Sequence, residues 1–513
     1  MTTSAKELLD LDATAQADLV RRGEVSASEL TEASIDAIER LDTQLDAILH
    51  KAFDQAMAAA QQPIDPQTPF CGVPMVFKDY EQPVRGLPFS FAALPFLRHN
   101  PWIGDEDGNF AADLRKAGLV FLGRANCSLG AFLPTHDIDA HVMPRNPWNP
   151  DFSTSGSSSG SATAVAARLV PIAHGGDGGG SIRMPASFCG VVGMKPTRGR
   201  VSVGSDRSEV FHFGSAWSHE FVISRSVRDT AGVLAATQGW RLGDSLPVVN
   251  VSPVSSRSQK GGQSLRIGVS TNAFSANIET DGQCAAGAEH AARVLEGLGH
   301  AVDVVSPPRH DLGAEEWDYG PPMGTHFTQI ARLLDKVGKI VGRPVTEADV
   351  GPQMWACAEM GRSTSLLQIL EFSEALQRKI VAFDTWWQTA GIDVLVTPTV
   401  AVPPPPITEY LPPPHGTFEI PDDNPFVGLS HNATQSAYTA IYNWTGQPAI
   451  SLPLATSQGG LPIGVQLAAA RMHDDMLLQL AFDLEEAVPW GQRRPAVCAS
   501  NSGREVNHSD RNA

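Results

Sequence analysis

Two segments rich in serine and glycine lie close together in the chain. They are SGSSSGS, residues 155–161, and GGDGGGS, residues 175–181, and each leads into a well-patterned segment. A hydroxyl group that attacks a carbonyl carbon needs a base to take its proton and aligned N–H donors for the oxyanion that forms. The two segments supply hydroxyl groups and unhindered backbone amides, so they are candidates for this chemistry.

The second segment offers a nucleophile beside a row of backbone donors. Gly178, Gly179 and Gly180 precede Ser181 directly. Their amides can approach a ligand closely, because glycine has no side chain and adopts dihedral angles that other residues avoid. We therefore expect the amides of these three glycines and of Ser181 to form an oxyanion hole, with the Ser181 hydroxyl as the nucleophile.

The base is harder to assign from sequence. Ser157 lies 24 residues before Ser181, just ahead of a helix predicted to begin near Ser159. His174 precedes the glycines on a predicted strand and is not assigned as the base. Lys78 ends the apolar run VPMVF, where it would be buried. Burial lowers the pKa of a lysine from about 10.4, and a lowering of about 3 units costs roughly 4 kcal/mol. Lys78 is the candidate base.

Simpler explanations exist for each feature. By itself SGSSSGS has the composition of a surface linker, and Lys78 that of a solvated charge at a strand end. The glycine segment has some likeness to a phosphate-binding loop, but no G-K-[ST] follows it and Arg183 is the only nearby cation. Asp177 and Arg183 are interpreted as structural, pairing to brace the loop.

Other reactive side chains carry no site. Cys189 is interpreted as a packed small hydrophobe. His136 and His141 have poor metal-ligand spacing on a helix. We therefore predict neither a metal nor a cofactor.

The elements that would position these residues alternate between strands and helices, which predicts an α/β fold. We expect a large mixed, mostly parallel central sheet covered by helices on both faces. Residues 1–498 are predicted to form one domain, with a helical N-terminal segment over about 4–60 and a helical excursion over about 315–388. Residues 499–513 are predicted to be a disordered tail. The predicted strands are 73–79, 119–126, 171–176, 265–271, 301–305, 393–400 and 462–470, and the helices between them are 108–118, 162–170, 284–299 and 475–488.

Composition sets the broad class. The chain has 513 residues, 42% of them hydrophobic, and a formal net charge of −18. A nucleic-acid partner is not expected, because nucleic-acid binding calls for a basic face. Neither a membrane span nor a signal peptide is predicted. Six scattered cysteines are typical of free thiols in a reducing compartment, so a cytoplasmic location is expected.

Several motifs of the chain together resemble those of a known family. Lys78-Asp79, the stretch GSSSGSATAVAARLVP and the stretch GDGGGSIRMPASFCGVVGMKPTRGRVS are similar to the amidase signature family of hydrolases. The segments RSVRD, DVLVTPT and TGQPAISLPL extend the similarity over nearly the whole chain outside the helical excursion. An isolated glycine–serine loop is a weak signal, but the spacing and the flanking segments make this match specific.

The resemblance implies a Ser–Ser–Lys triad and a fold with a mixed central sheet. Ser181 would be the nucleophile, and Ser157, in a cis-peptide setting, would relay its proton to a neutral Lys78. An acyl-enzyme would then be hydrolysed by water. Two features depart from the family pattern, because Gly176 stands where Thr or Asn is usual and Leu129 lies near a usual glutamate.

The expected function is hydrolysis of small, largely uncharged amides through an acyl-enzyme. The N-terminal stretch, RNPWNP and MKPTRGRVS are most similar to members that act on cyclic amides and anilides, and carbamates are further candidate substrates. The alternative is the amidase subunit of a tRNA-dependent amidotransferase, although that relative has Gln where this chain has Met184. A non-catalytic scaffold is disfavoured because all three triad positions are filled. A homodimer is the expected assembly.

Overall fold

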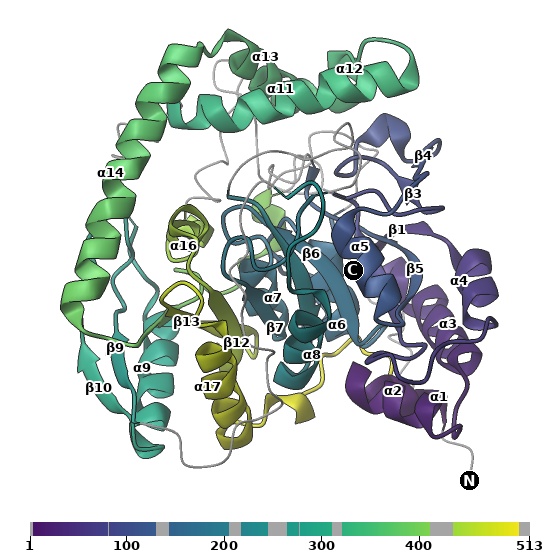
Figure 1. The fold of residues 1–513 in the computed structure, drawn as a ribbon, viewed down its shortest axis with the longest axis horizontal. Coiled ribbons are helices and arrows are strands. Elements are labelled where there is room, and N and C mark those ends of the chain that lie inside the picture. The colour runs from purple at the N-terminus through teal and green to yellow at the C-terminus, as the bar shows by residue number, and fades with distance from the viewer. Residues whose placement is uncertain are drawn as a thin grey trace, which may run out of the picture.

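The computed structural model describes residues 4–80, 82–129, 143–204, 217–244, 264–275, 278–309, 321–410 and 434–501, and Figure 1 shows their arrangement. Eleven of the described strands form one sheet, in the order β1-β5-β2-β6-β8-β7-β12-β13-β11-β9-β10. In chain order the strands are β1 (Ile48–Lys51), β2 (Pro74–Lys78), β5 (Val120–Ala125), β6 (Ile172–Asp177), β7 (Val192–Lys195), β8 (His219–Ser224), β9 (Arg266–Val269), β10 (Ala301–Val304), β11 (Val394–Pro398), β12 (Ala449–Thr456) and β13 (Pro462–Ala469). Two short strands, β3 (Pro88–Phe89) and β4 (Trp102–Ile103), pair separately.

The mixed α/β sheet is confirmed, and its parallel pairs fall into two groups. One group is β5, β2 and β6, and the other is β11, β9 and β10. Strands β8, β7, β12 and β13 join the two groups through antiparallel pairs. The expectation of mostly parallel pairing applies to the two groups, because there the strands are linked through helices that return the chain to the same edge.

Helices cover both faces of the sheet, as the alternation within β11 illustrates. Val394 and Val396 pack in the main hydrophobic core with α9 (Gly282–Gly297) and α17 (Asp474–Ala487). Leu395, between them, packs in a second, aromatic cluster with α14 (Leu366–Ala390) and α16 (Ala440–Thr445). Successive side chains of a strand point to opposite faces, so both faces of this strand are buried.

The remaining helices of the sheet region are α5 (Asn109–Lys116), α6 (Ser159–Ala166), α7 (Arg183–Cys189) and α8 (Val227–Thr237). The predicted helices 108–118 and 162–170 correspond to α5 and α6, whereas α7 and α8 were not predicted. Helix α6 begins at Ser159, as the sequence indicated.

The N-terminal segment is helical with one interruption that the sequence analysis missed. Its helices are α1 (Ala5–Asp10), α2 (Ala13–Arg21), α3 (Ala27–Leu45) and α4 (Phe53–Ala60). Ser26 and Glu29 form a capping box at the start of α3. Between α3 and α4 the chain forms β1, which pairs antiparallel with β5 at the edge of the sheet. A strand this short has too few residues to show a period against the helical pattern around it.

The helical excursion is present over the residues described. Helices α11 (Pro321–Val341), α12 (Glu347–Val350), α13 (Pro352–Ser363) and α14 run across the top and down the left side of the view in Figure 1. Buried side chains of α11 and α13 share a hydrophobic cluster with Phe89 and Phe91, which lie in and after β3. The excursion is thus anchored to the segment that follows β2.

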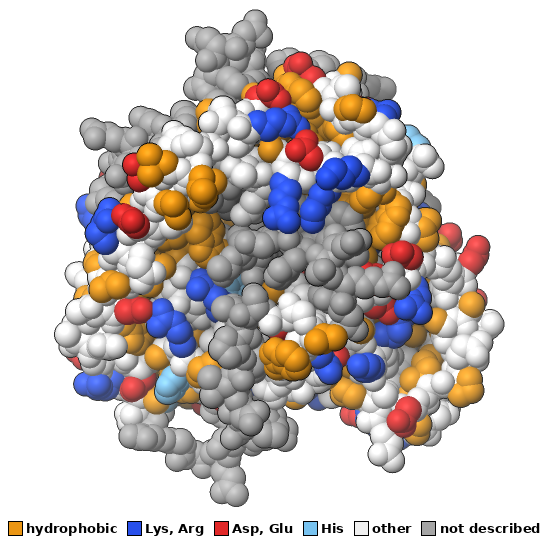
Figure 2. All heavy atoms as spheres, turned by 45° about the horizontal axis from the view of Figure 1, so that its top comes forward, with side chains coloured by type: hydrophobic (Ala, Val, Ile, Leu, Met, Phe, Trp, Pro, Cys, Tyr) orange, Lys and Arg blue, Asp and Glu red, His pale blue; other side chains and the backbone are white. Residues whose placement is uncertain are grey.

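The C-terminal segment stays packed against the domain slightly longer than predicted. Ala499, assigned to the tail from sequence, is fully buried, and its N–H donates to the carbonyl of Ala167. Residues 502–513 lie outside the described residues. Among the described helices, none is long and apolar enough to cross a membrane. On the face shown in Figure 2, basic side chains are interspersed with acidic and hydrophobic ones over the described surface.

A crowded group of carboxylates joins α2, α8 and α17, and it predicts a pH-dependent stability. Burial raises the pKa of Glu485 to about 7, and the charges of Asp12 and Asp229 add to this effect against an N–H donated by Val227. The folded state therefore holds this proton more tightly than the unfolded chain does. Stability is lost as the pH rises from about 4.5 through 7.

Replacing Glu485 by glutamine should remove this loss, since an amide oxygen still accepts from Val227 and carries no charge. We expect Glu485→Gln to stabilise the protein at pH 8 by about 1 kcal/mol after allowance for solvent screening, and to have no effect at pH 4.5. Thermal melting at both pH values measures this, with exposed Glu296→Gln on α9 as the control. Equal melting temperatures of variant and wild type at pH 8 would contradict it.

Candidate active site

Lys78 is the last residue of β2, a strand that is buried along its whole length. Its side chain is 1% exposed. Nζ donates to Ser157 Oγ at 2.8 Å and to the carbonyl of Gly176 at 3.4 Å. It also lies 5.2 Å from the centre of the Tyr80 ring. The amine is therefore held between the two serine- and glycine-rich segments, where the sequence predicted it.

The first segment reaches Lys78 through Ser157, which is buried just before α6. The Gly156–Ser157 peptide bond is cis. The next residue, Ser158, joins the two segments: its N–H donates to the carbonyl of Ser181 at 3.2 Å, and its hydroxyl donates to the carbonyl of Gly176 at 3.2 Å. The residues predicted to act together are thus brought into one region.

The second segment begins in β6 and continues past its end at Asp177. Gly178, Gly179 and Ser181 are partly exposed, whereas Gly180 is buried. A Cβ atom built on Gly178 or Gly179 would meet nothing within 4 Å, so neither glycine is required there by close packing of a side chain. Gly180 has φ +131°, and a Cβ there would lie 2.2 Å from Thr439 Oγ1. Only glycine fits at that position.

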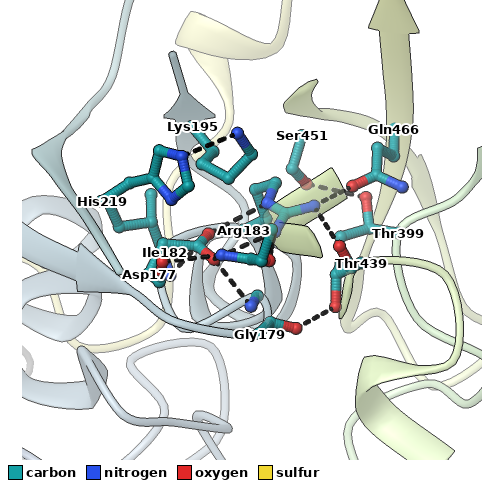
Figure 3. A network of polar contacts seen from close by, with 12 residues as sticks. Asp177, Gly179, Ile182, Arg183, Lys195, His219, Thr399, Thr439, Ser451 and Gln466 are labelled. Atoms are coloured by element: carbon teal, nitrogen blue, oxygen red, sulfur yellow. Dashed lines mark hydrogen bonds and ion pairs between the residues drawn. The ribbon is translucent and has the colours of Figure 1, made fainter. Parts of the chain in front are cut away.

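Asp177 and Arg183 form the predicted brace, and both are fully buried (Figure 3). Arg183 Nε and Nη2 donate to the two carboxylate oxygens of Asp177 at 2.9 Å each. Burial opposes ionisation of Asp177, but the Arg183 charge and hydrogen bonds from Arg183 and Asn443 outweigh it and lower the pKa well below its usual range. Asp177 is therefore a fixed anion that accepts from the Gly180 N–H at 2.7 Å and from the Ile182 N–H at 3.3 Å.

This geometry narrows the predicted set of oxyanion donors. The Gly180 N–H points to the Asp177 carboxylate, so it serves the brace. Gly178, Gly179 and Ser181 are the three residues of the set that are partly exposed, and their amides stay candidates for the oxyanion hole.

Residues near the C-terminal end of the chain complete the brace, and the sequence analysis missed them. Asn443 donates to the carbonyl of Asp177 at 2.7 Å and to its carboxylate at 2.9 Å. Arg183 Nη1 donates to Gln466 Oε1 at 2.8 Å and to the carbonyl of Thr439 at 2.9 Å. No local pattern in the sequence marks Thr439, Asn443 and Gln466 as partners of Asp177 and Arg183.

Asp79 anchors the turn that follows Lys78. Its carboxylate accepts the N–H groups of Ser90 and Ala93 at 2.9 Å, and its carbonyl accepts that of Ala92. Burial raises the pKa of Asp79 to about 7, against the charge of Arg124 and the two N–H donors. The same turn includes Phe91, which packs in the hydrophobic cluster of the helical excursion. The end of β2 is therefore held by hydrogen bonds to Asp79 and by this packing.

Two of the side chains not assigned to the site are packed in the core. His174 stacks on Phe77 with 3.8 Å between ring centres, and its Nε2 lies 3.3 Å from Glu220 Oε2. Cys189 is fully buried, and burial raises the pKa of its thiol. Leu129 is buried in the cluster of the helical excursion. His136 and His141 lie outside the described residues.

A mixed α/β sheet that brings a buried lysine, a serine-rich loop and a braced glycine–serine loop together defines a class of hydrolases that act on amides. Residues 29–478 match the family model described as Amidase, and the chain therefore belongs to the amidase family, here the amidase signature enzymes. It is an enzyme that hydrolyses carbon–nitrogen bonds.

Individual relatives agree with the subgroup indicated by the sequence. The chain is 37% identical over 489 residues to a 6-aminohexanoate-cyclic-dimer hydrolase of Paenarthrobacter ureafaciens, covering 95% of this chain and 96% of that protein. The solved structure of a 6-aminohexanoate cyclic dimer hydrolase with its substrate superposes with a TM-score of 0.86 at 36% identity, over 95% of this chain and 99% of the other. A bacterial aryl acylamidase of the amidase signature family gives 0.78 at 25% identity, over 98% and 99%.

Proposed function

We propose that the enzyme hydrolyses small, largely uncharged amides by acyl transfer to Ser181, with Ser157 and Lys78 moving the proton. The observation that carries this proposal is the 2.8 Å contact between Lys78 Nζ and Ser157 Oγ, made where Ser158 ties the Ser157 segment to the carbonyl of Ser181. Desolvation of an amine disfavours its charged form, so burial favours a neutral Lys78 before the reaction begins. Only the neutral amine has the free electron pair that accepts a proton.

In the first half-reaction the Ser181 oxygen bonds to the carbonyl carbon of the substrate. Its proton passes to Ser157, whose own proton passes to the neutral amine of Lys78. The tetrahedral oxyanion is held by the N–H groups of Gly178, Gly179 and Ser181. When the carbon–nitrogen bond breaks, the departing nitrogen takes a proton back through Ser157, and an ester remains on Ser181.

In the second half-reaction water replaces the amine. Water attacks the ester carbon and gives its proton to Ser157 and Lys78 along the same route. The carbon–oxygen bond to Ser181 breaks, the Ser181 oxygen takes the proton back from Lys78 through Ser157, and the carboxylic acid leaves. Each proton that Lys78 accepts is returned, so the cycle needs no external base.

The preference for small neutral substrates rests on the relatives, one of which is a 6-aminohexanoate cyclic dimer hydrolase solved with its substrate. Cyclic amides, linear amides and anilides are the proposed substrates. The carbonyl carbon of a carbamate also bears an amine leaving group and can be attacked by the same Ser181 nucleophile. Carbamates are therefore included among the proposed substrates. A homodimeric state and a cytoplasmic location stay predictions.

The competing function is that of an amidotransferase subunit, which would act only within a larger complex. The position occupied by Gln in that relative is Met184 here, and Met184 packs in an apolar cluster with Phe188 and Val400. A thioether in such surroundings offers an amino-acid substrate no charged contact. This observation favours the independent amidase.

The isolated chain should hydrolyse an acyl p-nitroanilide without ATP, metal or a second protein. The enzyme is treated with a chelator, and the release of nitroaniline is then followed by absorbance. A comparison of kcat/KM across anilides, cyclic amides and carbamates ranks the substrate classes. Turnover that begins only when partner subunits are added would support the amidotransferase instead.

A further inference from the structure

One peptide unit of the glycine loop is held at both of its ends. The carbonyl of Gly179 accepts a hydrogen bond from Thr439 Oγ1 at 2.6 Å, and the N–H of Gly180 donates to Asp177 Oδ1 at 2.7 Å (Figure 3). Carbonyl and N–H point in opposite directions across a planar trans peptide. The two bonds together therefore fix the rotation of the Gly179–Gly180 unit about the chain.

We propose that Thr439 is a positioning residue for the oxyanion hole, acting through the Gly179–Gly180 peptide. This inference rests on the proposed function, in which the N–H groups of Gly179 and Ser181 hold the oxyanion. Those two amides belong to the peptide units on either side of the fixed one. If the Gly179 carbonyl lost its donor, this unit would rotate more freely and both flanking N–H groups would lose their direction.

Thr439 is suited to this role because it is itself fixed. The residue is fully buried, and its carbonyl accepts from Arg183 Nη1 at 2.9 Å. The same arginine holds Asp177, which binds the other end of the peptide. Arg183 thus sets the separation of the two groups that grip the Gly179–Gly180 unit.

The segment that carries Thr439 also contacts the first serine loop. Gln435 accepts a hydrogen bond from the Ser155 hydroxyl at 2.5 Å, and Asn443 donates to the carbonyl of Asp177. Residues 435–443 thus reach both loops from a position more than 250 residues away in sequence. This segment therefore connects the loop that contains Ser155 to the glycine loop that ends at Ser181.

The test compares Thr439 variants with and without the hydroxyl. Thr439→Val has nearly the same shape but no donor, Thr439→Ala removes both the hydroxyl and the methyl group, and Thr439→Ser keeps the donor. Direct loss of an oxyanion donor lowers kcat by about 100- to 1,000-fold. For a residue acting through a peptide we expect a smaller loss of about tenfold in the Val and Ala variants, an unchanged KM, and activity within about twofold of wild type in the Ser variant.

The matched control is Thr237→Val in α8. Thr237 is also a buried threonine whose hydroxyl donates to a backbone carbonyl, that of Val233 at 2.8 Å, and it lies in α8, outside both loops. The Thr439 hydroxyl has the carbonyl of Ser436, at 3.3 Å, as a second and longer acceptor. It should keep the wild-type kcat. Melting curves of all variants separate loss of fold from loss of rate.

A second readout distinguishes positioning from packing. An arylboronic acid forms a tetrahedral anion on a serine nucleophile. A neutral substrate analogue that does not react with serine reports on ground-state binding alone. Boronate affinity should fall in Thr439→Val and Thr439→Ala by the same factor as kcat, with the affinity for the neutral analogue unchanged.

Wild-type kcat and boronate affinity in either folded variant would overturn the inference. The proposed function fails by a different result, namely hydrolysis that persists without Ser181. A loss shared by Thr439→Ser would also overturn the role of the hydroxyl, because that variant retains the donor.

Discussion

Replacing Ser181 by alanine is expected to abolish amide hydrolysis, with kcat reduced by about 10⁵-fold or more. The variant removes the oxygen that would bond to the substrate carbon. Alanine fits the partly exposed position, and the brace is untouched because Asp177 accepts from the N–H groups of Gly180 and Ile182, on either side of residue 181. The fold should therefore be retained, as a melting curve will report.

The measurement is nitroanilide turnover under single-turnover and steady-state conditions, together with mass spectrometry after treatment with a fluorophosphonate. The wild type should gain the phosphonyl adduct on Ser181, and the variant should gain none. Ser159→Ala is the control, because its buried hydroxyl makes no hydrogen bond within the described part of the chain. Hydrolysis retained by Ser181→Ala at a comparable rate would remove Ser181 as the nucleophile.

Loss of the Lys78 amine should have the second-largest effect. Lys78→Ala and Lys78→Met remove the group 2.8 Å from the Ser157 hydroxyl, and we expect kcat to fall by about 10³-fold at pH 7. Met keeps most of the buried volume, so it separates the missing base from a missing side chain. Activity of both variants should rise at high pH, since hydroxide can then take the proton that Lys78 no longer accepts.

The cavity in Lys78→Ala allows a sharper test. A small primary amine such as ethylamine should restore part of the activity, in proportion to the concentration of its neutral form. Rescue should be absent in Lys78→Met, where the side chain fills the space. Near-wild-type rates of either variant at neutral pH would exclude Lys78 as the proton acceptor.

The candidate catalytic residues of this enzyme can be identified from short stretches of sequence. Lys78 ends an apolar run, and Ser181 follows three glycines, so the character of each position is visible within a few residues. Buried strands and amphipathic helices also leave short-range periods, which is why most elements were predicted within a few residues of their observed bounds. The similarity to a family then supplied the relation among Lys78, Ser157 and Ser181 that spacing alone left open.

Tertiary structure decided what depends on pairing between distant segments. No turn or periodic pattern in the sequences of β7, β8 and β12 indicates which strands they pair with. These strands, at the centre of the sheet, were therefore not predicted. Thr439 and Asn443 are polar residues without a motif, and they become partners of the glycine loop only when α16 folds against it. The diversion of the Gly180 N–H to Asp177 likewise depends on peptide orientation. A hydrogen bond requires direction as well as composition, and the direction of a backbone N–H is fixed only by the packed chain.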